Sequence, residues 1–533
     1  MSTAGMNLRS NFPVGSTRWA TRRAQWLALG LSDADLTKPK IAVVNSSSGL
    51  APCFSHLDPI AAAVRESIAA AGGVGFEIRT VAPTDFIMSA GAGGGYVLSS
   101  RDLVAKDIEA VVEGAQLDGM VCLASCDKTT PGQLMAAARV DVPTLIVACG
   151  YQSCGRLDSG ERVDIEEVFL RASQVRSGGI TVDALCDLSE RAITGPGVCT
   201  GMGTANSMHI VAEALGMTLP GTTPVRANSA PMWDAVRASG AAIMDAVLAD
   251  RRPRTILTPA AFANAVMAVL AISGSINTVK HLQAIAREAG TDTDVYRLFE
   301  SYADTIRPLS AVRPNGDDTI EEFEDAGGAA AVLKQLGDHV HGEAVTVTGE
   351  TVARRVARAI VKDEAVIRPL SHPRGDHPTV VVIRGSLAPE SAIVKLSVTE
   401  SRARTFAGPA RVFEDAAAAI AGIEGGAVRP GDVLVLRGLG WIGTPGMGMA
   451  SQPVFALDAV GLTERVAVVT DGQLSGLVNR GIVVGEVRPE GALPGPLAVV
   501  ADGDRISIDL DARRVDLLVD PAELDRRRTV RES

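Results

Sequence analysis

The stretch GMVCLASCDKTTPGQLMAAARVDVPTLIVACG, residues 119–150, decides the fold. It contains two short apolar runs, GMVCLA and TLIVACG, and a third run, IAVVN, begins upstream at Ile41. Runs that are apolar at consecutive positions are typical of parallel strands that are buried on both faces. The amphipathic stretches 57–71 and 100–113 predict helices between such strands. The N-terminal part is therefore predicted to be an α/β domain with a parallel sheet and helices.

Beyond about residue 365 the sequence changes to short runs rich in valine and isoleucine, separated by glycine and proline, such as TVVVIRG, DVLVLRG and RVAVVTDG. Closely spaced short strands of this kind predict a β-barrel-like domain. A chain of 533 residues is also too long for one hydrophobic core, because single cores stop growing near ~250–300 residues. We therefore expect an α/β domain over residues 1–360 and a β-barrel-like domain over residues 361–533.

Composition and charge exclude several classes of partner. Hydrophobic residues make up 46% of the chain and charged residues 21%, which is typical of an ordinary folded protein. The net charge of −11 disfavours nucleic acid and anionic membrane surfaces as partners. No apolar run reaches the ~20 residues that a membrane-spanning helix needs, and the first residues lack the apolar centre of a secretory signal. We expect a cytoplasmic protein whose seven cysteines are buried thiols or metal ligands rather than disulfides.

Three cysteines stand apart from the other four because they occur in loops rich in glycine, proline and polar residues. Cys53 lies in LAPCFSHLD, Cys126 in ASCDKTTPG and Cys199 in GPGVCTGMGTAN. Three thiolates from separate loops can converge on one iron-sulfur cluster and leave one iron open to a substrate oxygen. Each thiol could equally be a small buried hydrophobe, which is the usual fate of a free cysteine, and no compact CxxC spacing decides between the two interpretations.

Other polar residues near strand ends also have one functional and one purely structural interpretation. Asp127 and Lys128 follow Cys126 directly, and Asp85 lies in the loop VAPTDFIM. Carboxylates at such positions could bind magnesium, which prefers oxygen ligands, or they could be ordinary turn and cap residues. Ser475 lies in TDGQLSG after the run RVAVVT, where glycines allow a sharp turn close to a ligand or form an ordinary Asp-Gly turn.

Taken together and in this order, several long motifs resemble the dehydratase family that includes dihydroxy-acid dehydratase, 6-phosphogluconate dehydratase and the sugar-acid dehydratases. The most specific matches are CDKTTPGQLMAAARVDVPTLIV, GMGTANSMHIVAEALGMTLPG, IRPLSHP, GPARVFE and TDGQLSG. Several separate long matches are far stronger evidence than one short motif. The resemblance implies a hydro-lyase that removes water from a 2,3-dihydroxy carboxylic acid to leave a 2-keto acid.

The resemblance also implies the site. Cys53, Cys126 and Cys199 would hold a 2Fe-2S or 4Fe-4S cluster, while Asp85, Asp127 and a carboxylated Lys128 would bind magnesium. Ser475 would be the catalytic base that removes the C2 proton. The substrate would be a small hydroxy acid, and the assembly a homodimer or homotetramer.

The sequence also departs from the family pattern. Where the family places a carboxylate ligand for magnesium, the segment GTPGMGMAS offers Met449, and a thioether cannot replace a carboxylate on that ion. The family's PCN is PCF here, with Phe54, its GGSTN element is GSIN, with Ile276, and HVSPE is EVRPE, with Glu486 and Arg488.

These departures leave three functions open. We expect a sugar-acid dehydratase first, because RPRTILTPAAF and its neighbourhood look more like that branch. The alternatives are a dihydroxy-acid dehydratase of branched-chain amino-acid biosynthesis, which GLSDADLTKPKIAVVNS resembles, and an iron-sulfur paralogue that binds or regulates without dehydrating.

Overall fold

The N-terminal half is built around a parallel sheet covered by helices, as the sequence predicts. A computed structural model describes residues 8–91, 94–175, 178–398, 403–476, 478 and 480–532. Four strands pair in the order β2-β1-β3-β4, all parallel. Their bounds are β1 Lys40–Asn45, β2 Val74–Arg79, β3 Gly119–Ala124 and β4 Thr144–Ala148. Residues of β1, β3 and β4 are buried throughout, which explains their continuous apolar runs.

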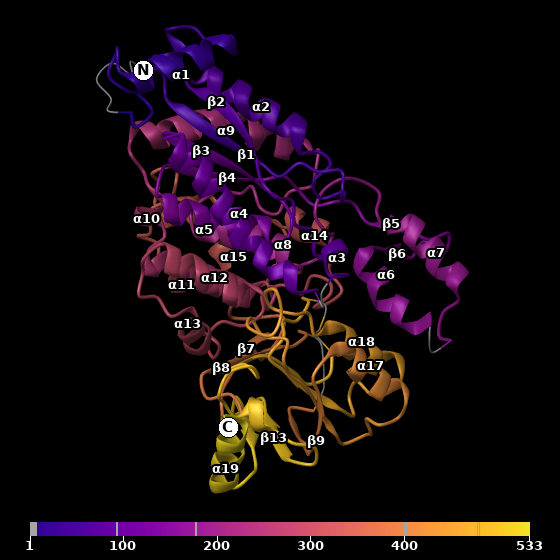
Figure 1. Ribbon diagram of the computed structural model, residues 1–533. Coiled ribbons are helices and arrows are strands. Elements are labelled where there is room, and N and C mark those ends of the chain that lie inside the picture. The colour runs from indigo at the N-terminus through magenta and orange to yellow at the C-terminus, as the bar shows by residue number, and fades with distance from the viewer. Residues whose placement is uncertain are drawn as a thin grey trace.

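Helices cover both faces of this sheet (Figure 1). α2 (Leu57–Ala70) and α9 (Ala230–Leu248) pack together on one face, while α4 (Gly95–Gly114) and α5 (Thr129–Val140) pack together on the other. The α2–α9 contact is close because Gly240 has no side chain: a Cβ there would lie 2.2 Å from the Ser67 carbonyl carbon. Substitution of Gly240 would therefore push the two helices apart.

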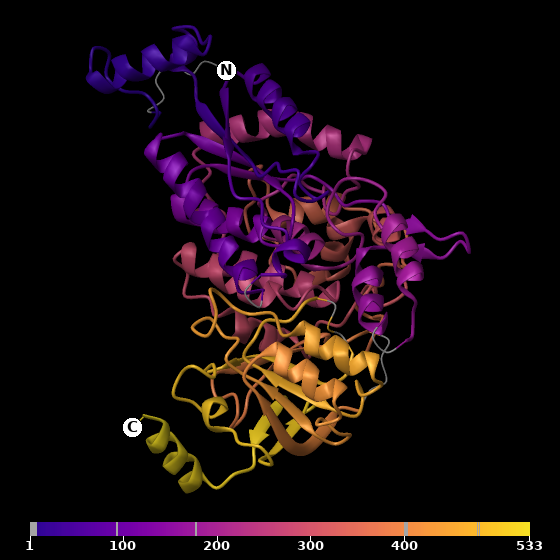
Figure 2. The same ribbon diagram turned by 45° about the vertical axis from the view of Figure 1, so that its right-hand side comes forward.

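The remaining N-terminal helices form a second layer and a projecting arm. In both views the arm that contains α6 and α7 lies beside α17 and α18 of the C-terminal half (Figures 1 and 2). The helices are α1 Thr17–Ala28, α3 Asp85–Met88, α6 Ile165–Ala172, α7 Val182–Arg191, α8 Thr204–Ala214, α10 Pro253–Ile256, α11 Pro259–Ala271, α12 Thr278–Glu288, α13 Val295–Tyr302, α14 Ile320–Asp325, α15 Gly328–Gln335 and α16 Val352–Arg358. The arm also carries the short hairpin of β5 (Gly155–Arg156) and β6 (Arg162–Val163).

The C-terminal half is a nearly closed sheet of eight strands, which confirms the barrel-like prediction. The strand order is β14-β13-β9-β10-β11-β12-β8-β7, and β9 to β12 are parallel neighbours. The two end strands of this sheet, β7 and β14, approach each other. Arg384, which follows β7, exchanges backbone hydrogen bonds with Arg513 and Val515 of the β14 region at 3.1 and 2.9 Å, so the sheet nearly closes. Its elements are β7 Val380–Ile383, β8 Ser391–Lys395, β9 Thr405–Phe413, α17 Ala416–Glu424, β10 Val433–Leu436, α18 Ser451–Ala459, β11 Ala467–Thr470, β12 Val483–Arg488, β13 Arg505–Asp509, β14 Arg514–Leu517 and α19 Pro521–Glu532.

The predicted domain boundary at residue 360 falls between α16 and β7 and stays a prediction. Contacts across the junction are intimate: Lys395 of β8 is buried and its Nζ donates hydrogen bonds to the carbonyl oxygens of Ser273 (2.7 Å) and Gly274 (2.9 Å). Among the described residues, no helix is both long and apolar enough to cross a membrane.

This buried lysine should make stability depend on pH. Burial lowers the pKa of Lys395 to about 7, whereas an unfolded lysine titrates near ~10.4. Between these values the unfolded chain holds a proton that the folded chain has released, so stability rises as the pH rises through this window. The melting temperature of the wild type, measured relative to that of Lys395→Met, should therefore increase as the pH rises from about 7.5 to about 9.5.

The exposed Lys106 supplies the control, because Lys106→Met should follow the wild-type pH profile. If the Lys395→Met profile also runs parallel to the wild type, the buried amine does not titrate in this window.

Candidate active site

A cavity of about 450 Å³ lies at the junction of the two halves. Its walls come from loops that follow parallel strands of both sheets: Asp85 follows β2, Cys126 follows β3, Asp415 follows β9 and Leu439 follows β10. Ser475 follows β11 in the same way. Ligand sites in α/β folds form outside the carboxyl ends of parallel strands, where loop side chains converge. Here two such edges face one cavity, so each half supplies part of the site.

The three predicted cysteines lie together. Cys126 and Cys199 line the cavity, and the Cys53 thiol is within hydrogen-bonding reach of the Cys126 thiol. That contact and burial raise the pKa of Cys126, and burial together with the nearby acids Asp127 and Glu166 raises the pKa of Cys199. The remaining cysteines are placed otherwise: Cys122 and Cys149 are buried in the core beside the sheet, while Cys154 and Cys186 are outside the cavity wall.

These thiols suit a cluster better than a single ion. Among the residues that the structure describes, no group of three or more histidine, cysteine, aspartate or glutamate side chains is arranged to hold one metal ion. Thiolates that bind a cluster attach to different iron atoms, so they do not need to meet at a single point. Three cysteines from separate loops beside one cavity are the donor set that such a cluster requires.

The predicted magnesium residues also lie together, and the carboxylation of Lys128 stays a prediction. Lys128 is buried and its Nζ contacts Asp85 Oδ2 at 2.6 Å, while Asp85 Oδ1 is buried and has no hydrogen-bond partner among the residues that the structure describes. Burial opposes the charge on Lys128, yet the Asp85 and Asp127 carboxylates outweigh it and raise the pKa of the lysine. Burial and the Asp85 charge raise the pKa of Asp127 to about 7. The unpartnered oxygen and the two crowded carboxylates are groups that a cation would stabilise.

Ser475 faces this cavity from the C-terminal half. Its backbone N–H donates to Ser451 Oγ at 2.8 Å, and a Cβ at the adjacent Gly476 would lie 3.3 Å from Ser275 Oγ of the N-terminal half. Asp471, in the same turn, stabilises it. The Asp471 carboxylate accepts hydrogen bonds from the backbone N–H groups of Gly438, Leu439 and Gly491 at 2.8 to 3.0 Å. The hydroxyl-bearing loop is thus fixed against both halves.

A buried ion pair that the sequence did not predict joins the halves beside the cavity. Lys280 Nζ of α12 contacts Glu486 Oε1 of β12 and the Oδ1 atom of Asn277, and both charged side chains are less than a tenth exposed. Asn277 lines the cavity and donates from Nδ2 to Thr204 Oγ1 at 3.1 Å. Glu486 adopts the left-handed conformation (φ +55°), and its N–H donates to the carbonyl of Gly472 in the Ser475 loop. The pair therefore holds side chains of both walls.

One side of the cavity is apolar. Phe169 of α6 contacts Phe86 of α3 and Phe455 of α18, with ring centroids 5.4 and 5.2 Å apart in edge-to-face geometry. Ile420 of α17 and Leu439 continue this side. We call the set Phe86, Phe169, Ile420, Leu439 and Met449 the apolar wall.

The departures from the family pattern differ in their distance from the cavity. Met449 lies in the wall itself, and its side chain packs so closely on Gly94 that a Cβ at Gly94 would lie 2.5 Å from Met449 Cγ. Phe54 and Ile276, in contrast, are fully buried in the core and do not line the cavity. Of these three positions, only Met449 changes the chemistry of the cavity surface.

Sequence reasoning missed several residues of the site. Asn277, Asp415, Phe86 and Phe169 line the cavity. Glu166 is buried, and burial and the charges of neighbouring acids raise its pKa. The GSIN element hinted at Asn277, since a polar residue there interrupts an apolar stretch. No local signal distinguishes Phe169 or Glu166, which reach the site only because the arm folds back.

Comparison with known proteins agrees with this architecture. The N-terminal model of the dihydroxy-acid/6-phosphogluconate dehydratase family matches residues 38–355, and the C-terminal model matches residues 365–533. A dihydroxy-acid dehydratase of Ignicoccus hospitalis is 40% identical over 96% of this chain and 92% of its own length. Dihydroxy-acid dehydratases of Syntrophobacter fumaroxidans and Pyrococcus abyssi are 38% and 40% identical, each over 98% of this chain and 93% and 94% of theirs.

The fold thus places thiols, carboxylates and a serine around one cavity between a half with a parallel sheet and helices and a barrel-like half. The chain belongs to the dihydroxy-acid/6-phosphogluconate dehydratase family and is a hydro-lyase. This outcome supports an enzyme over the non-dehydrating paralogue, and the relatives favour the dihydroxy-acid alternative over the sugar-acid one that we put first.

The buried pair predicts a large stability effect. Glu486→Gln removes the anion and leaves the Lys280 ammonium buried without a charged partner, which should cost about 3–5 kcal/mol of unfolding free energy. Replacement of both residues, as Lys280→Met with Glu486→Leu, should cost less than Glu486→Gln alone, because no charge then stays buried. Chemical denaturation measures all three proteins.

The control is the exposed pair of Arg358 and Glu350, where Glu350→Gln should cost no more than about 1 kcal/mol. A Glu486→Gln protein as stable as the control would mean that this pair does not hold the two halves together.

Proposed function

We propose that this hydro-lyase is a dihydroxy-acid dehydratase, which converts a 2,3-dihydroxy carboxylic acid with a short alkyl side chain to the 2-keto acid. The apolar wall is the observation that carries this proposal. A sugar acid would place hydroxyl groups against Phe169, Ile420 and Leu439, where a buried hydroxyl without a partner costs ~1–3 kcal/mol. An alkyl chain gains free energy from the same contact. The names of the relatives agree with this substrate class.

The donor groups around the cavity fit the cofactors that the family resemblance implies. Cys53, Cys126 and Cys199 would hold an iron-sulfur cluster, and Asp85 and Asp127 would bind magnesium, joined by Lys128 if that lysine carries a carboxylate. When bound, these groups would supply a Lewis acid for the departing C3 hydroxyl and positive charge for the carboxylate and C2 oxygen. Burial, together with the charges of neighbouring groups, raises the pKa values of Cys126, Asp127 and Cys199, and a bound cation would offset this cost, which supports the assignment.

The protein itself would supply orientation and a proton acceptor. Ser475 is proposed to take the C2 proton on its Oγ, while the C3 hydroxyl leaves and the enol so formed becomes the keto acid. A serine is a weak base, so its role requires positive charge nearby. Asn277 is held by Lys280 and Thr204 in one orientation beside this position, and the apolar wall would contact the alkyl substituents on C3 and so orient the substrate. The cytoplasmic location and the homodimer or homotetramer stay predictions.

Two variants separate the base from the cluster. Ser475→Ala should keep its iron and sulfide but lose about 10²–10⁴-fold in the rate of C2 deuterium exchange, as expected for loss of a general base. Cys126→Ser should lose iron, because a hydroxyl is a poor cluster ligand compared with a thiolate. Cys122→Ser makes the same atomic change within β3 and should keep the cluster.

Iron content, absorbance and exchange are measured on the same anaerobic samples. Exchange in Ser475→Ala within about threefold of wild type, far below the usual general-base effect, would show that another residue is the base. Full iron content in Cys126→Ser would remove Cys126 from the cluster.

The apolar wall predicts substrate preference. The wild type should turn over 2,3-dihydroxy acids with branched alkyl chains with a kcat/KM at least tenfold higher than aldonates of similar length, since a few apolar contacts are worth ~1–3 kcal/mol. Ile420→Ser should lower kcat/KM for the alkyl substrate by about tenfold, and Ile420→Val by much less. A panel of both substrate classes, assayed for keto-acid release, tests this. Preference for aldonates would overturn the proposed substrate class but not the family.

A further inference from the structure

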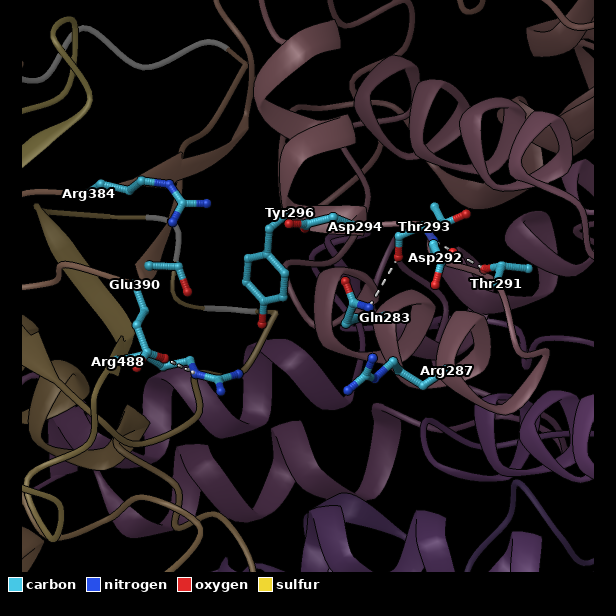
Figure 3. A pocket seen from close by; sticks show the side chains of 11 residues that line it. Gln283, Arg287, Thr291, Asp292, Thr293, Asp294, Tyr296, Arg384, Glu390 and Arg488 are labelled. Carbon is cyan, nitrogen blue, oxygen red and sulfur yellow. Dashed lines mark hydrogen bonds and ion pairs between the residues drawn. The ribbon is translucent and has the colours of Figure 1, made fainter.

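A second cavity, of about 460 Å³, also lies at the junction of the two halves (Figure 3). One side comes from the end of α12 and the segment that leads into α13, with Gln283, Arg287 and the run Thr291–Tyr296 apart from Val295. The other side comes from the barrel-like half, with Arg384, Glu390, Ser391 and Arg488. Cavities of this size at domain junctions are preferred ligand sites. None of these residues lines the catalytic cavity.

Two guanidinium groups face the same open space in this cavity. Figure 3 shows the side chains of Arg287 and Arg488 extending toward each other, one from each half, with the Tyr296 hydroxyl between them. Arg488 is joined to Glu390 at 3.4 Å, but both side chains are more than half exposed, so this pair is weak. Arg384, in contrast, is committed to Glu300 at 2.6 Å. Paired guanidinium groups bind carboxylates and phosphates through several parallel hydrogen bonds.

The same cavity also carries acidic groups. Within the described part of the chain, neither Arg287 nor Asp292 has a side-chain hydrogen bond or ion pair, although both line this cavity. Asp294 uses one oxygen to cap α13, accepting the backbone N–H of Arg297 at 3.1 Å. Arg287 and Asp292 lie on the same side of the cavity without contacting each other, so a positive and a negative group are both open to a ligand there. A simple anion would satisfy the arginines and leave Asp292 unmatched.

We propose that this second cavity binds a small zwitterion of the amino-acid class. The carboxylate of this ligand would lie between Arg287 and Arg488 and would accept a hydrogen bond from the Tyr296 hydroxyl. The ammonium group of the ligand would face Asp292. The hydroxyls of Thr291, Thr293 and Ser391 supply further polar lining. This proposal goes beyond the proposed function and does not depend on it.

A ligand here would also affect the catalytic cavity. Arg488 lies two residues beyond Glu486, and β12 shifts register against β8 between Gly485 and Arg488. Glu486 in turn contacts Lys280, which contacts Asn277 of the catalytic cavity. A molecule held by Arg287 on one half and Arg488 on the other would bridge the junction at which both cavities lie. Any change in substrate affinity caused by the ligand must be matched by an equal change in ligand affinity caused by substrate.

Binding is tested on the full chain without turnover. Calorimetry and thermal shift would compare glycine and a panel of free L-amino acids with acetate, which has only the anion, and methylammonium, which has only the cation. We expect at least one amino acid to bind more than tenfold tighter than acetate and methylammonium. Arg287→Gln and Asp292→Asn should each weaken that binding about tenfold or more, since each removes a charged partner.

The matched control is Arg297→Gln, on the neighbouring exposed face of α13, which should bind as the wild type does. Absence of binding for every amino acid, binding of acetate as tight as that of the best amino acid, or an Asp292→Asn variant with unchanged affinity would each overturn the proposal. Because the measurement needs neither cluster nor substrate, its failure leaves the proposed dehydratase function untouched, and failure of that function leaves this binding site untouched.

Discussion

The contact between Lys280 and Glu486 is the interaction on which the active site depends. It joins α12 of the N-terminal half to β12 of the C-terminal half in a place that water hardly reaches. A charge taken out of water is costly unless an opposite charge with good hydrogen bonds meets it, so each half needs the other at this point. Asn277 and the Ser475 loop are attached to the two partners. The pair therefore fixes the relative position of groups that belong to the N-terminal and C-terminal halves.

Charged groups in the cavity around Ser475 are also costly unless a group of opposite charge lies close to them. Cys126 and Glu166 are buried and Cys199 and Asp127 are partly buried near one another, and burial or their mutual repulsion raises the pKa of each. Lys128 is the cation paired with Asp85 at this place. Such a concentration of acids binds protons unless positive charge displaces them, and metal binding releases those protons. A cationic cofactor would offset the repulsion among these acids, which is consistent with the cofactors that we propose for this cavity.

Patterns over a few neighbouring residues predicted the buried strands and the loop residues that directly follow them. Continuous apolar runs predicted the buried parallel strands, and Cys53, Cys126 and Asp85 were found because polar residues after such strands lie at one edge of the sheet. Phe169, Glu166 and Glu486 could not be found in this way. Phe169 enters the site because α6 folds back against α18, and Glu486 because a bulge in β12 turns it inward. Long-range packing of this kind leaves no periodic pattern in the sequence.

Met449 connects the departure from the family pattern with the substrate. At the position where the family resemblance expects a carboxylate, this chain has a thioether that packs on Gly94 and belongs to the apolar wall. A thioether in place of a carboxylate means one anion fewer beside Asp85 and Asp127, which lessens their repulsion and would weaken the binding of the proposed magnesium ion. It also extends the surface against which an alkyl chain can be buried. In the proposed enzyme, this one difference would therefore favour an apolar substrate over cation binding, and the carboxylates of Asp85 and Asp127 would have to hold magnesium without a third carboxylate.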